Sequence, residues 1–359
     1  MSIAPIKGRG AASNPANRFE EIHLEPSDDW NPKEDLPPLT RLFRDHTKTV
    51  LTYNESPDLG FDVSLNPYRG CEHGCIYCYA RPYHEYLGFS AGLDFETKIM
   101  VKEDAPELLR QELSSAKWKP KVVAMSGVTD CYQPIERKLK VTRRCLEVLA
   151  EFRNPVCIVT KNFLVTRDLD LLRELARHQA AAVYVSVTTL DPALTPIMEP
   201  RSSLPALRLD AIRTLRNAGV PVGVMVAPVI PALTDHEMPA ILAAAVRAGA
   251  QYAGYIVLRL PYGVASLFEA WLGQHFPDQK EKVLNRIRSL RRGKFNDSKF
   301  GTRMTGEGIF AAQIEKIFDV ACRKAGIVNR HVPISASAFR VPGGAQLTFF
   351  EESVERAAD

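Results

Sequence analysis

The chain has 359 residues, of which 45% are hydrophobic and 25% charged, and its formal net charge is +4. This composition is typical of a globular protein with a sizeable core, in one barrel-like domain or two smaller ones, and so weak a charge does not by itself indicate a nucleic-acid partner. The seven cysteines are odd in number and irregularly spaced, which argues against a secreted disulfide framework. No signal peptide is recognisable and no stretch approaches the ~20 apolar residues of a membrane span, so we expect a cytoplasmic protein without a membrane partner.

Residues 1–60 are rich in Pro, Asn, Asp and Arg and show little periodicity. This pattern predicts an extended or partly disordered, irregular lead-in. Four apolar side chains could let it wrap the domain that follows: Trp30, Leu36, Leu39 and Leu42.

From residue 61 short apolar runs alternate with longer segments of helical periodicity. The runs cover residues 61–68, 121–127, 155–161, 181–189, 220–230 and 253–260, and the helical segments cover 137–152, 167–178, 204–219 and 235–249. Such alternation predicts a parallel sheet built from right-handed βαβ units, with strands buried on both faces. We therefore expect an α/β fold, a partial (β/α)6 TIM-like barrel over residues 61–276, with its chemistry at the carboxyl ends of the strands.

The tail has a different character. Residues 280–303 form a basic, helix-like run, residues 305–326 a second helix, and the rest is irregular. We expect residues 277–359 to be a helical, basic C-terminal appendage.

The most informative stretch is the cysteine loop (residues 71–78), in which Cys71, Cys75 and Cys78 have Cys-x3-Cys-x2-Cys spacing. Thiolates are soft ligands that suit zinc or iron–sulfur clusters. A structural zinc site normally has four protein ligands, yet the chain has no second cysteine pair of this kind and His73 is too near Cys71 to serve easily. A [4Fe–4S] cluster would leave one iron open to a small molecule, and zinc or a purely redox cluster remain the alternatives.

This spacing, in a loop after the first strand of a six-unit βα barrel, resembles the radical S-adenosylmethionine (SAM) superfamily. The resemblance implies that the open iron binds SAM and that an electron from the cluster cleaves SAM to a 5′-deoxyadenosyl radical, which abstracts hydrogen from a substrate. It also implies an electron donor such as ferredoxin or flavodoxin.

Further motifs resemble the spore photoproduct lyase group, which are DNA-repair-photolyase-like members of the superfamily. They are "RGCEHGCIYCYA", "TD" at residues 129–130, "VTK" ending at 161, "VSVTT" with "MEPR", and "VMVAPVIP". The resemblance spans about residues 60–260. It implies the following roles: Cys71, Cys75 and Cys78 bind the cluster, Thr129, Asp130, Lys161, Ser186 and Ala227 lie around SAM, and Tyr77 and Tyr79 form a radical or hydrogen-atom relay.

One position departs from the lyase pattern. The lyases carry a hydrogen-donating cysteine three residues before the shared aspartate, and Gly127 stands there in this chain. Cys131 follows the aspartate and is a candidate substitute. The lyase reaction, which reverses a thymine dimer, is therefore less firmly implied than the cofactor chemistry.

Each of these residues also has a structural interpretation. Thr129 and Asp130 could cap a helix or turn, Ser186 could bond locally within its strand, and Lys161 could lie on the surface. Tyr77 and Tyr79 could shield the cluster by packing, and Cys131 could be a buried, inert thiol. Glu199 could orient the SAM ribose or form an ion pair. Packing is the expected role of Cys145, Cys157 and Cys322.

The basic run of residues 286–303 contains interleaved aromatic residues, which suits contacts with a nucleic-acid backbone and stacking on bases. A solvated helix face is the alternative. The basic side chains of this run are Arg286, Arg288, Arg291, Arg292, Lys294, Lys299 and Arg303.

The function that we predict is a radical SAM enzyme that abstracts hydrogen from a nucleic acid base. The alternatives are a radical SAM enzyme acting on a peptide or small metabolite, and a non-catalytic iron–sulfur protein that binds nucleic acid or senses redox state.

Overall fold

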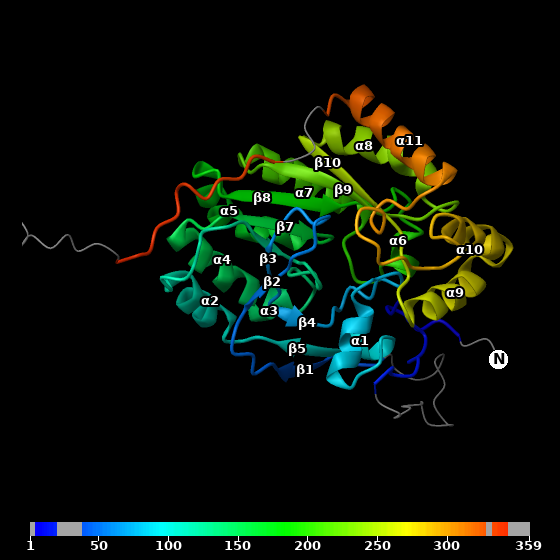
Figure 1. Cartoon of the computed structure of the whole chain (residues 1–359), viewed down its shortest axis with the longest axis horizontal. Coiled ribbons are helices and arrows are strands. Elements are labelled where there is room, and N and C mark those ends of the chain that lie inside the picture. Colours follow the sequence, from blue (N-terminus) through cyan, green and yellow to red (C-terminus); the bar gives the residue numbers. More distant parts are fainter. Residues whose placement is uncertain (1–3, 20–37, 328–331, 344–359) are drawn as a thin grey trace, which may run out of the picture.

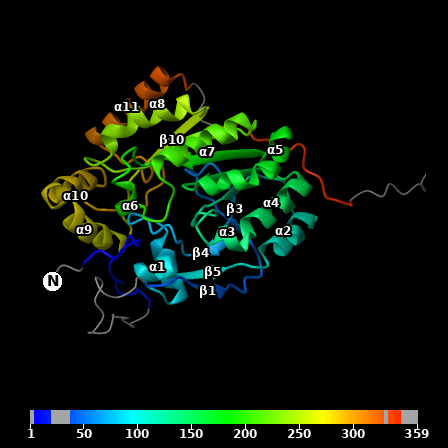
Figure 2. The ribbon, with the colours of Figure 1, turned by 180° about the vertical axis from the view of Figure 1, so that it is seen from behind.

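The computed structural model describes residues 4–19, 38–327 and 332–343. Two sheets organise this part of the chain, a large one near its centre and a small one beside α1 (Leu93–Thr97). Figures 1 and 2 show the small sheet on the side of the molecule opposite α8 and α11. Trp30 and Leu36 lie outside the described residues, whereas Leu39 and Leu42 are exposed rather than docked.

The large sheet has seven strands in the order β10-β9-β8-β7-β6-β3-β2. Neighbouring strands from β3 to β10 are parallel, and only the edge pair β2–β3 is antiparallel. The parallel α/β sheet predicted from the six apolar runs is thus confirmed, and each run contains one of the strands. Their bounds are β2 Leu51–Tyr53, β3 Val63–Leu65, β6 Val123–Met125, β7 Val156–Thr160, β8 Ala181–Ser186, β9 Val222–Val229 and β10 Tyr252–Val257.

Helical segments connect these parallel strands, as the periodicity predicts. Short helices α3 (Glu136–Leu139), η2 (Phe163–Asp168), α6 (Thr195–Met198) and η3 (Asp235–Glu237) precede the longer ones. The longer helices are α4 (Val141–Phe152), α5 (Leu169–Arg177), α7 (Pro205–Asn217) and α8 (Met238–Arg247).

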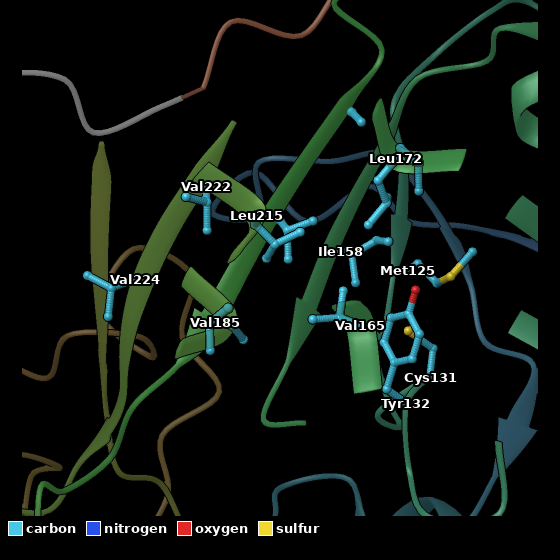
Figure 3. Packing of buried hydrophobic residues seen from close by; sticks show 14 of the residues in the cluster. Met125, Cys131, Tyr132, Ile158, Val165, Leu172, Val185, Leu215, Val222 and Val224 are labelled. Carbon is cyan, nitrogen blue, oxygen red and sulfur yellow. The ribbon is translucent and has the colours of Figure 1, made fainter. Parts of the chain in front are cut away.

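The main core forms where β-branched strand residues meet leucines of these helices. Ile158, Val185 and Val222 are fully buried on the sheet, and they belong to the same cluster as Leu172 of α5 and Leu215 of α7 (Figure 3). Strand β6 is buried on both faces, as expected for a covered parallel strand. Cys157 and Val159 of β7 remain partly exposed, so the expected burial on both faces holds only in part. The packing holds the strands rigid and presents their carboxyl ends as a platform for the loops.

The small sheet was not predicted from the sequence. It has the order β1-β5-β4, with β1 (Arg41–Arg44) parallel and β4 (Tyr68–Arg69) antiparallel to β5 (Lys98–Val101). Strands β1 and β2 both come from the segment expected to be an irregular lead-in. Strand β1 pairs with β5, which lies far along the chain, whereas β2 pairs with its neighbour β3. The helices η1 (Arg81–Leu87) and α2 (Ala105–Ser114) complete this region.

The last described helices are α9 (Val264–His275), η4 (Pro277–Gln279), α10 (Lys280–Ser289) and α11 (Ile309–Ala325). Helix α11 packs on α8 and on the sheet: Phe318 is buried in the main core and its ring lies 4.7 Å from that of Tyr255. It therefore contributes to the core, where the sequence suggested an appendage. In the described part of the chain, no helix is both long and apolar enough to span a membrane.

Candidate active site

The cysteine loop follows β4 and brings three unpaired thiols into one place. Cys71 and Cys75 are buried and Cys78 is partly exposed. The partly exposed Cys78 packs against two separate apolar clusters, one containing Cys71 and the other Cys75. Cys78 is thus the most exposed of the three thiols, and each of the other two lies in one of the clusters that it contacts.

The donor set fits a cluster better than a single ion. Within the described residues, no three His, Cys, Asp or Glu side chains are grouped closely enough to hold one metal ion. A [4Fe–4S] cluster imposes no such requirement, because each cysteine binds a different iron. Burial raises the pKa of the Cys71 and Cys75 thiols. A cationic iron centre is what would keep such buried thiols ionised.

The buried side chain of Arg81 fixes the shape of the loop. Its guanidinium donates to the carbonyl oxygens of Cys75 at 3.0 Å and Gly74 at 3.1 Å, and to the Glu96 carboxylate at 2.6 Å. Both charged side chains are fully buried, so their pairing and hydrogen bonds must offset the loss of hydration. The carbonyls of Gly74 and Cys75 are thus held by Arg81, while the three thiols of the loop form no disulfide.

The segment of residues 4–19 closes over this loop. Glu96 accepts hydrogen bonds from the amides of Gly10 at 3.0 Å and Ala11 at 2.9 Å. The approach is so close that a Cβ atom at Gly10 would lie 1.8 Å from the carbonyl oxygen of Gly74. Figures 1 and 2 show the segment running between α1 and α9. Ile6 and Ala11 belong to the same apolar cluster as Cys75, so the segment covers this part of the loop.

Asp130 connects the cysteine loop to the end of β7. It accepts hydrogen bonds from the hydroxyl of Thr160 at 2.8 Å and the amide of Lys161 at 2.8 Å, and Nδ1 of His73 lies 3.4 Å away. Burial alone would raise the pKa of Asp130, but His73 and these hydrogen bonds lower it below its ordinary value. The other ring nitrogen of His73 lies 3.1 Å from the amide nitrogen of Asn162. His73 is therefore a buried link between strand ends, a role that the sequence did not indicate.

Lys161, Ala227 and Glu199 meet at the carboxyl ends of β7 and β9. The ammonium of Lys161 donates to the carbonyl of Ala227 at 3.0 Å and lies 4.0 Å from the Glu199 carboxylate. Its side chain is 15% exposed, so it is neither on the open surface nor sealed off. Three of the residues predicted to surround SAM are thus in mutual contact.

Glu199 lies at the centre of a buried network. It pairs with Arg208 and accepts hydrogen bonds from the phenol of Tyr77 and from the hydroxyl of Thr188 at 2.8 Å. Burial would raise the pKa of Glu199, but Arg208 and Lys161 outweigh it and lower the pKa to about 2. Arg208 also donates to the carbonyl of Ser186 at 3.0 Å. Of the two interpretations left open for Glu199, the geometry favours the ion pair.

The two tyrosines that flank Cys78 lie in different environments. Tyr77 points inward and is buried, whereas Tyr79 is 39% exposed. The phenol of Tyr79 donates to the carbonyl of Gly127, and the guanidinium of Arg259 lies 4.8 Å from its ring centroid. Tyr79 therefore lies at the outer edge of the cysteine loop.

Comparisons with known proteins agree with this geometry. A model described as the Radical SAM superfamily matches residues 65–245. The chain belongs to the radical SAM superfamily. Its members are enzymes that use a [4Fe–4S] cluster and SAM and need a reductant.

An uncharacterized protein of Mycobacterium bovis is 38% identical over 240 residues, which are 66% of this chain and 69% of that protein. Another from Methanocaldococcus jannaschii is 32% identical over 178 residues, 50% of this chain and 64% of that protein.

Among solved structures, spore photoproduct lyase complexed with dinucleoside spore photoproduct has a similar fold. The TM-score is 0.55 at 16% identity, over 80% of this chain and 79% of the lyase. A mutant of the same enzyme with bound AdoMet and dinucleoside spore photoproduct gives a TM-score of 0.55 at 16% identity, over 80% of each chain. At this identity the likeness concerns the fold alone.

The radical SAM fold does not bring every predicted residue to the site. Cys131 follows Asp130, but its side chain is fully buried in the main core beside Met125 and Ile158 (Figure 3). This position favours packing over hydrogen donation. Thr129 is also buried, and its hydroxyl donates to the carbonyl of Tyr68 at 3.1 Å, so it fixes the loop that carries Asp130.

The basic run of this radical SAM protein has largely internal partners. Arg291 is 1% exposed and donates to four backbone carbonyls, among them Val257 at 2.9 Å and Arg303 at 2.8 Å. It is therefore not available to a nucleic acid. Arg292 pairs with Glu307, and Arg303 pairs with Asp58 at 2.5 Å. These contacts hold residues 291–307 against the carboxyl end of β10.

Proposed function

We propose that this protein is a radical SAM enzyme in which Cys71, Cys75 and Cys78 hold a [4Fe–4S] cluster with SAM on its open iron. The observation that carries the proposal is the gathering of three thiols in one loop that is close enough to Lys161 and Glu199 to interact with them electrostatically. Lys161 in turn contacts Ala227. When bound and reduced, the cluster and SAM supply a carbon radical that abstracts hydrogen from the substrate. The protein's own residues bind SAM, orient it and exclude water.

Lys161 is the residue that we assign to the SAM carboxylate. Its ammonium has only one hydrogen bond of normal length among the described residues, to the Ala227 carbonyl, and an ammonium has three donors. Asp130 fixes the backbone of Lys161, and Glu199 holds Tyr77. We therefore treat Asp130, Glu199 and Tyr77 as positioning residues, while Tyr79 is the tyrosine that a substrate can reach.

The substrate that we propose is a nucleic acid base, and the reaction is of the lyase type. The support is the fold shared with spore photoproduct lyase complexed with a dinucleoside, together with the motif resemblance over residues 60–260. A base within a duplex cannot reach a buried centre, so an unstacked base is the form that would enter. We further propose a cytoplasmic location with ferredoxin or flavodoxin as the electron donor, consistent with seven reduced cysteines.

Anaerobic reconstitution with iron and sulfide tests the cofactor assignment. We expect the single variants Cys71→Ala, Cys75→Ala and Cys78→Ala each to lose most of the bound iron and the visible absorbance of the cluster. Cys157→Ala is the matched control, because Cys157 is a partly buried cysteine of β7 outside the loop. Wild-type iron content in the three loop variants would contradict the assignment.

Incubation of the reduced wild-type protein with SAM and an oligonucleotide containing spore photoproduct tests the activity. We expect release of 5′-deoxyadenosine and restoration of the thymines. A cluster that forms without cleaving SAM would identify a sensor instead of an enzyme. Cleavage of SAM without change in the oligonucleotide would contradict the nucleic-acid substrate and favour a peptide or small metabolite.

A further inference from the structure

The tyrosines around the cysteine loop form a surface whose function the proposed chemistry does not explain. Tyr79 is 39%, Tyr83 54% and Tyr86 67% exposed. Tyr83 and Tyr86 lie three residues apart on the 3-10 helix η1, where side chains at this spacing stand on the same face. The residues between them, His84 and Glu85, point inward and are buried. Tyr83 and Tyr86 therefore both present their rings to solvent on one face of η1.

Aromatic side chains from neighbouring segments lie close to these two tyrosines. Phe19 stacks on Tyr86 with a centroid distance of 4.8 Å, and Tyr83 lies 6.4 Å from Tyr86. The guanidinium of Arg18 lies 4.9 Å from the ring of Phe19 and 3.7 Å from that of Tyr262. We call this area the tyrosine surface, and it consists of Phe19, Tyr79, Tyr83, Tyr86 and Tyr262 with Arg18 and Arg259.

Arg259 contributes a partly buried positive charge to this surface, in the electrostatic neighbourhood of Arg303 and its partner Asp58. It lies over the Tyr79 ring and interacts electrostatically with both Tyr79 and Tyr83. In the part of the chain that the structure describes, no acidic group lies within 4.0 Å of its guanidinium. Arg18, by contrast, is paired with Glu85 at 2.6 Å. An arginine beside exposed rings and without a carboxylate partner suits an anionic ligand such as a phosphate.

The surface is continuous with the candidate active site through Tyr79. This tyrosine follows the cluster cysteine Cys78 directly and bonds to Gly127 at the carboxyl end of β6. A planar group stacked on Tyr79 would therefore lie next to the cysteine loop, with its neighbours on Tyr83 and Tyr86.

We propose that the tyrosine surface binds single-stranded nucleic acid, with successive bases stacked on its rings and a phosphate held by Arg259. Rings and arginines alternate here as they do in proteins that bind single strands without sequence preference. Bases in a duplex are already stacked and cannot use the surface. The inference rests on the proposed function and adds to it the form in which the nucleic acid is recognised.

Fluorescence anisotropy of the full-length, cluster-loaded protein without reductant tests this binding. The probes are labelled DNA and RNA strands of about 12 nucleotides, within the site sizes of single-strand binders, and the matching duplex. We expect both strands, or one of them, to bind more tightly than the duplex. Tyr83→Ala and Tyr86→Ala should each weaken binding of the strand by about 5- to 100-fold, the usual loss for one stacked base.

Two kinds of variant control this experiment. Tyr86→Phe keeps the ring and should bind like the wild type, as should Tyr53→Ala, which removes an exposed tyrosine of β2 outside the surface. Arg259→Gln should make the salt dependence of binding shallower by about 0.7 in log–log slope, the contribution of one phosphate contact to a single strand.

Equal affinity for strand and duplex, or unchanged affinity in Tyr83→Ala and Tyr86→Ala, would overturn the inference. Cleavage of SAM is measured separately, without any oligonucleotide. A protein that cleaves SAM but binds no strand refutes the tyrosine surface alone. A protein that binds the strand through Tyr83 and Tyr86 but does not cleave SAM supports the surface and refutes the enzyme.

Discussion

The phenol of Tyr79 donates a hydrogen bond to the backbone carbonyl of Gly127. Tyr79 directly follows the cysteine loop and is accessible to solvent. Through this hydrogen bond it contacts the position at which the spore photoproduct lyase group, which this sequence resembles, carries a hydrogen-donating cysteine. The contact brings a predicted relay tyrosine next to the position where this chain has no thiol. Gly127 and Tyr79 are therefore the positions at which the proposed reaction type can be tested.

Gly127→Cys is expected to install that thiol without disrupting the fold. A Cβ atom at Gly127 would lie 3.3 Å from Cβ and 3.6 Å from Oγ of Ser64, a tight contact that a shift of a few tenths of an ångström relieves. We expect the new thiol to react with a thiol reagent in the protein without cluster, whereas the fully buried Cys131 should not. We also expect more thymine restored for each SAM cleaved.

Mass spectrometry of the labelled peptides distinguishes the introduced thiol from the native cysteines in this variant, with the wild type as reference. Rapid labelling of Cys131 in the wild type would contradict its assignment to the core. If Gly127→Cys folds and labels but restores no more thymine than the wild type, the lyase-type reaction is not the one this site performs.

Lys161→Met is expected to weaken SAM binding by about 10- to 100-fold, because a hydrogen bond between an ammonium and a carboxylate contributes about 1.5–3 kcal/mol. The methionine keeps the apolar stem of the side chain, so the iron content should not change. Equilibrium binding of SAM to the cluster-loaded protein measures the effect. Lys294→Met removes a basic residue of the 286–303 run as the control, and wild-type SAM affinity in Lys161→Met would refute the assignment.

Glu199 is expected to make the folded state sensitive to acid. Its folded pKa of about 2 lies below the ordinary value of 4.5, so its contribution to stability is present above pH 4.5 and is lost as the pH falls towards 2. Glu199→Gln leaves Arg208 buried without a counter-charge. It should lower the free energy of unfolding at neutral pH by about 3–5 kcal/mol and flatten the acid dependence.

Urea unfolding followed by circular dichroism at a series of pH values measures both effects of Glu199→Gln. Glu174→Gln is the matched control: its partner Arg177 is a surface residue at 2.8 Å, and exposed pairs contribute only about 0–1 kcal/mol. An acid dependence as steep in Glu199→Gln as in the wild type would show that other carboxylates dominate.

Gly10→Ala is expected to detach residues 4–19 from the cysteine loop, because the new Cβ would lie 1.8 Å from the Gly74 carbonyl. The cluster should then be lost several-fold faster in air, while its initial iron content stays near that of the wild type. Loss of visible absorbance after exposure to air measures the rate. Gly60→Ala is the control, since nothing lies within 4 Å of the added atom, and equal rates in the two variants would contradict the shielding role.

The parallel sheet and the cysteine loop could be predicted because their signals are local. The strands of the parallel sheet lie in six short apolar runs, four of which are followed by a segment of helical periodicity. The cysteine spacing lies within eight residues. The position of Lys161 at a strand end was equally visible. In each case the neighbours in sequence determine the environment.

The remaining parts of the site depend on contacts between distant segments. Arg208 lies in an amphipathic helix, where a charged residue is usually on the surface, yet it is buried because Glu199 neutralises it. No spacing in the sequence indicated the partners of His73, because Asp130 and Asn162 lie in segments that follow other strands. Arg81 and Glu96 pair only because η1 and α1 fold against each other. Polar side chains that meet only when distant segments pack together produce no periodic pattern in the sequence.

The docking of residues 4–19 also has a consequence for the order of events during synthesis. This segment is synthesised long before α9, yet Pro15 lies against Gly263 and Ile6 belongs to the same apolar cluster as Leu267 and Trp271 of α9. Its binding site is complete only after about 250 further residues have been made. The segment therefore cannot reach its final position until α9 exists, and we expect this delay to favour loading of the cysteine loop before residues 4–19 dock.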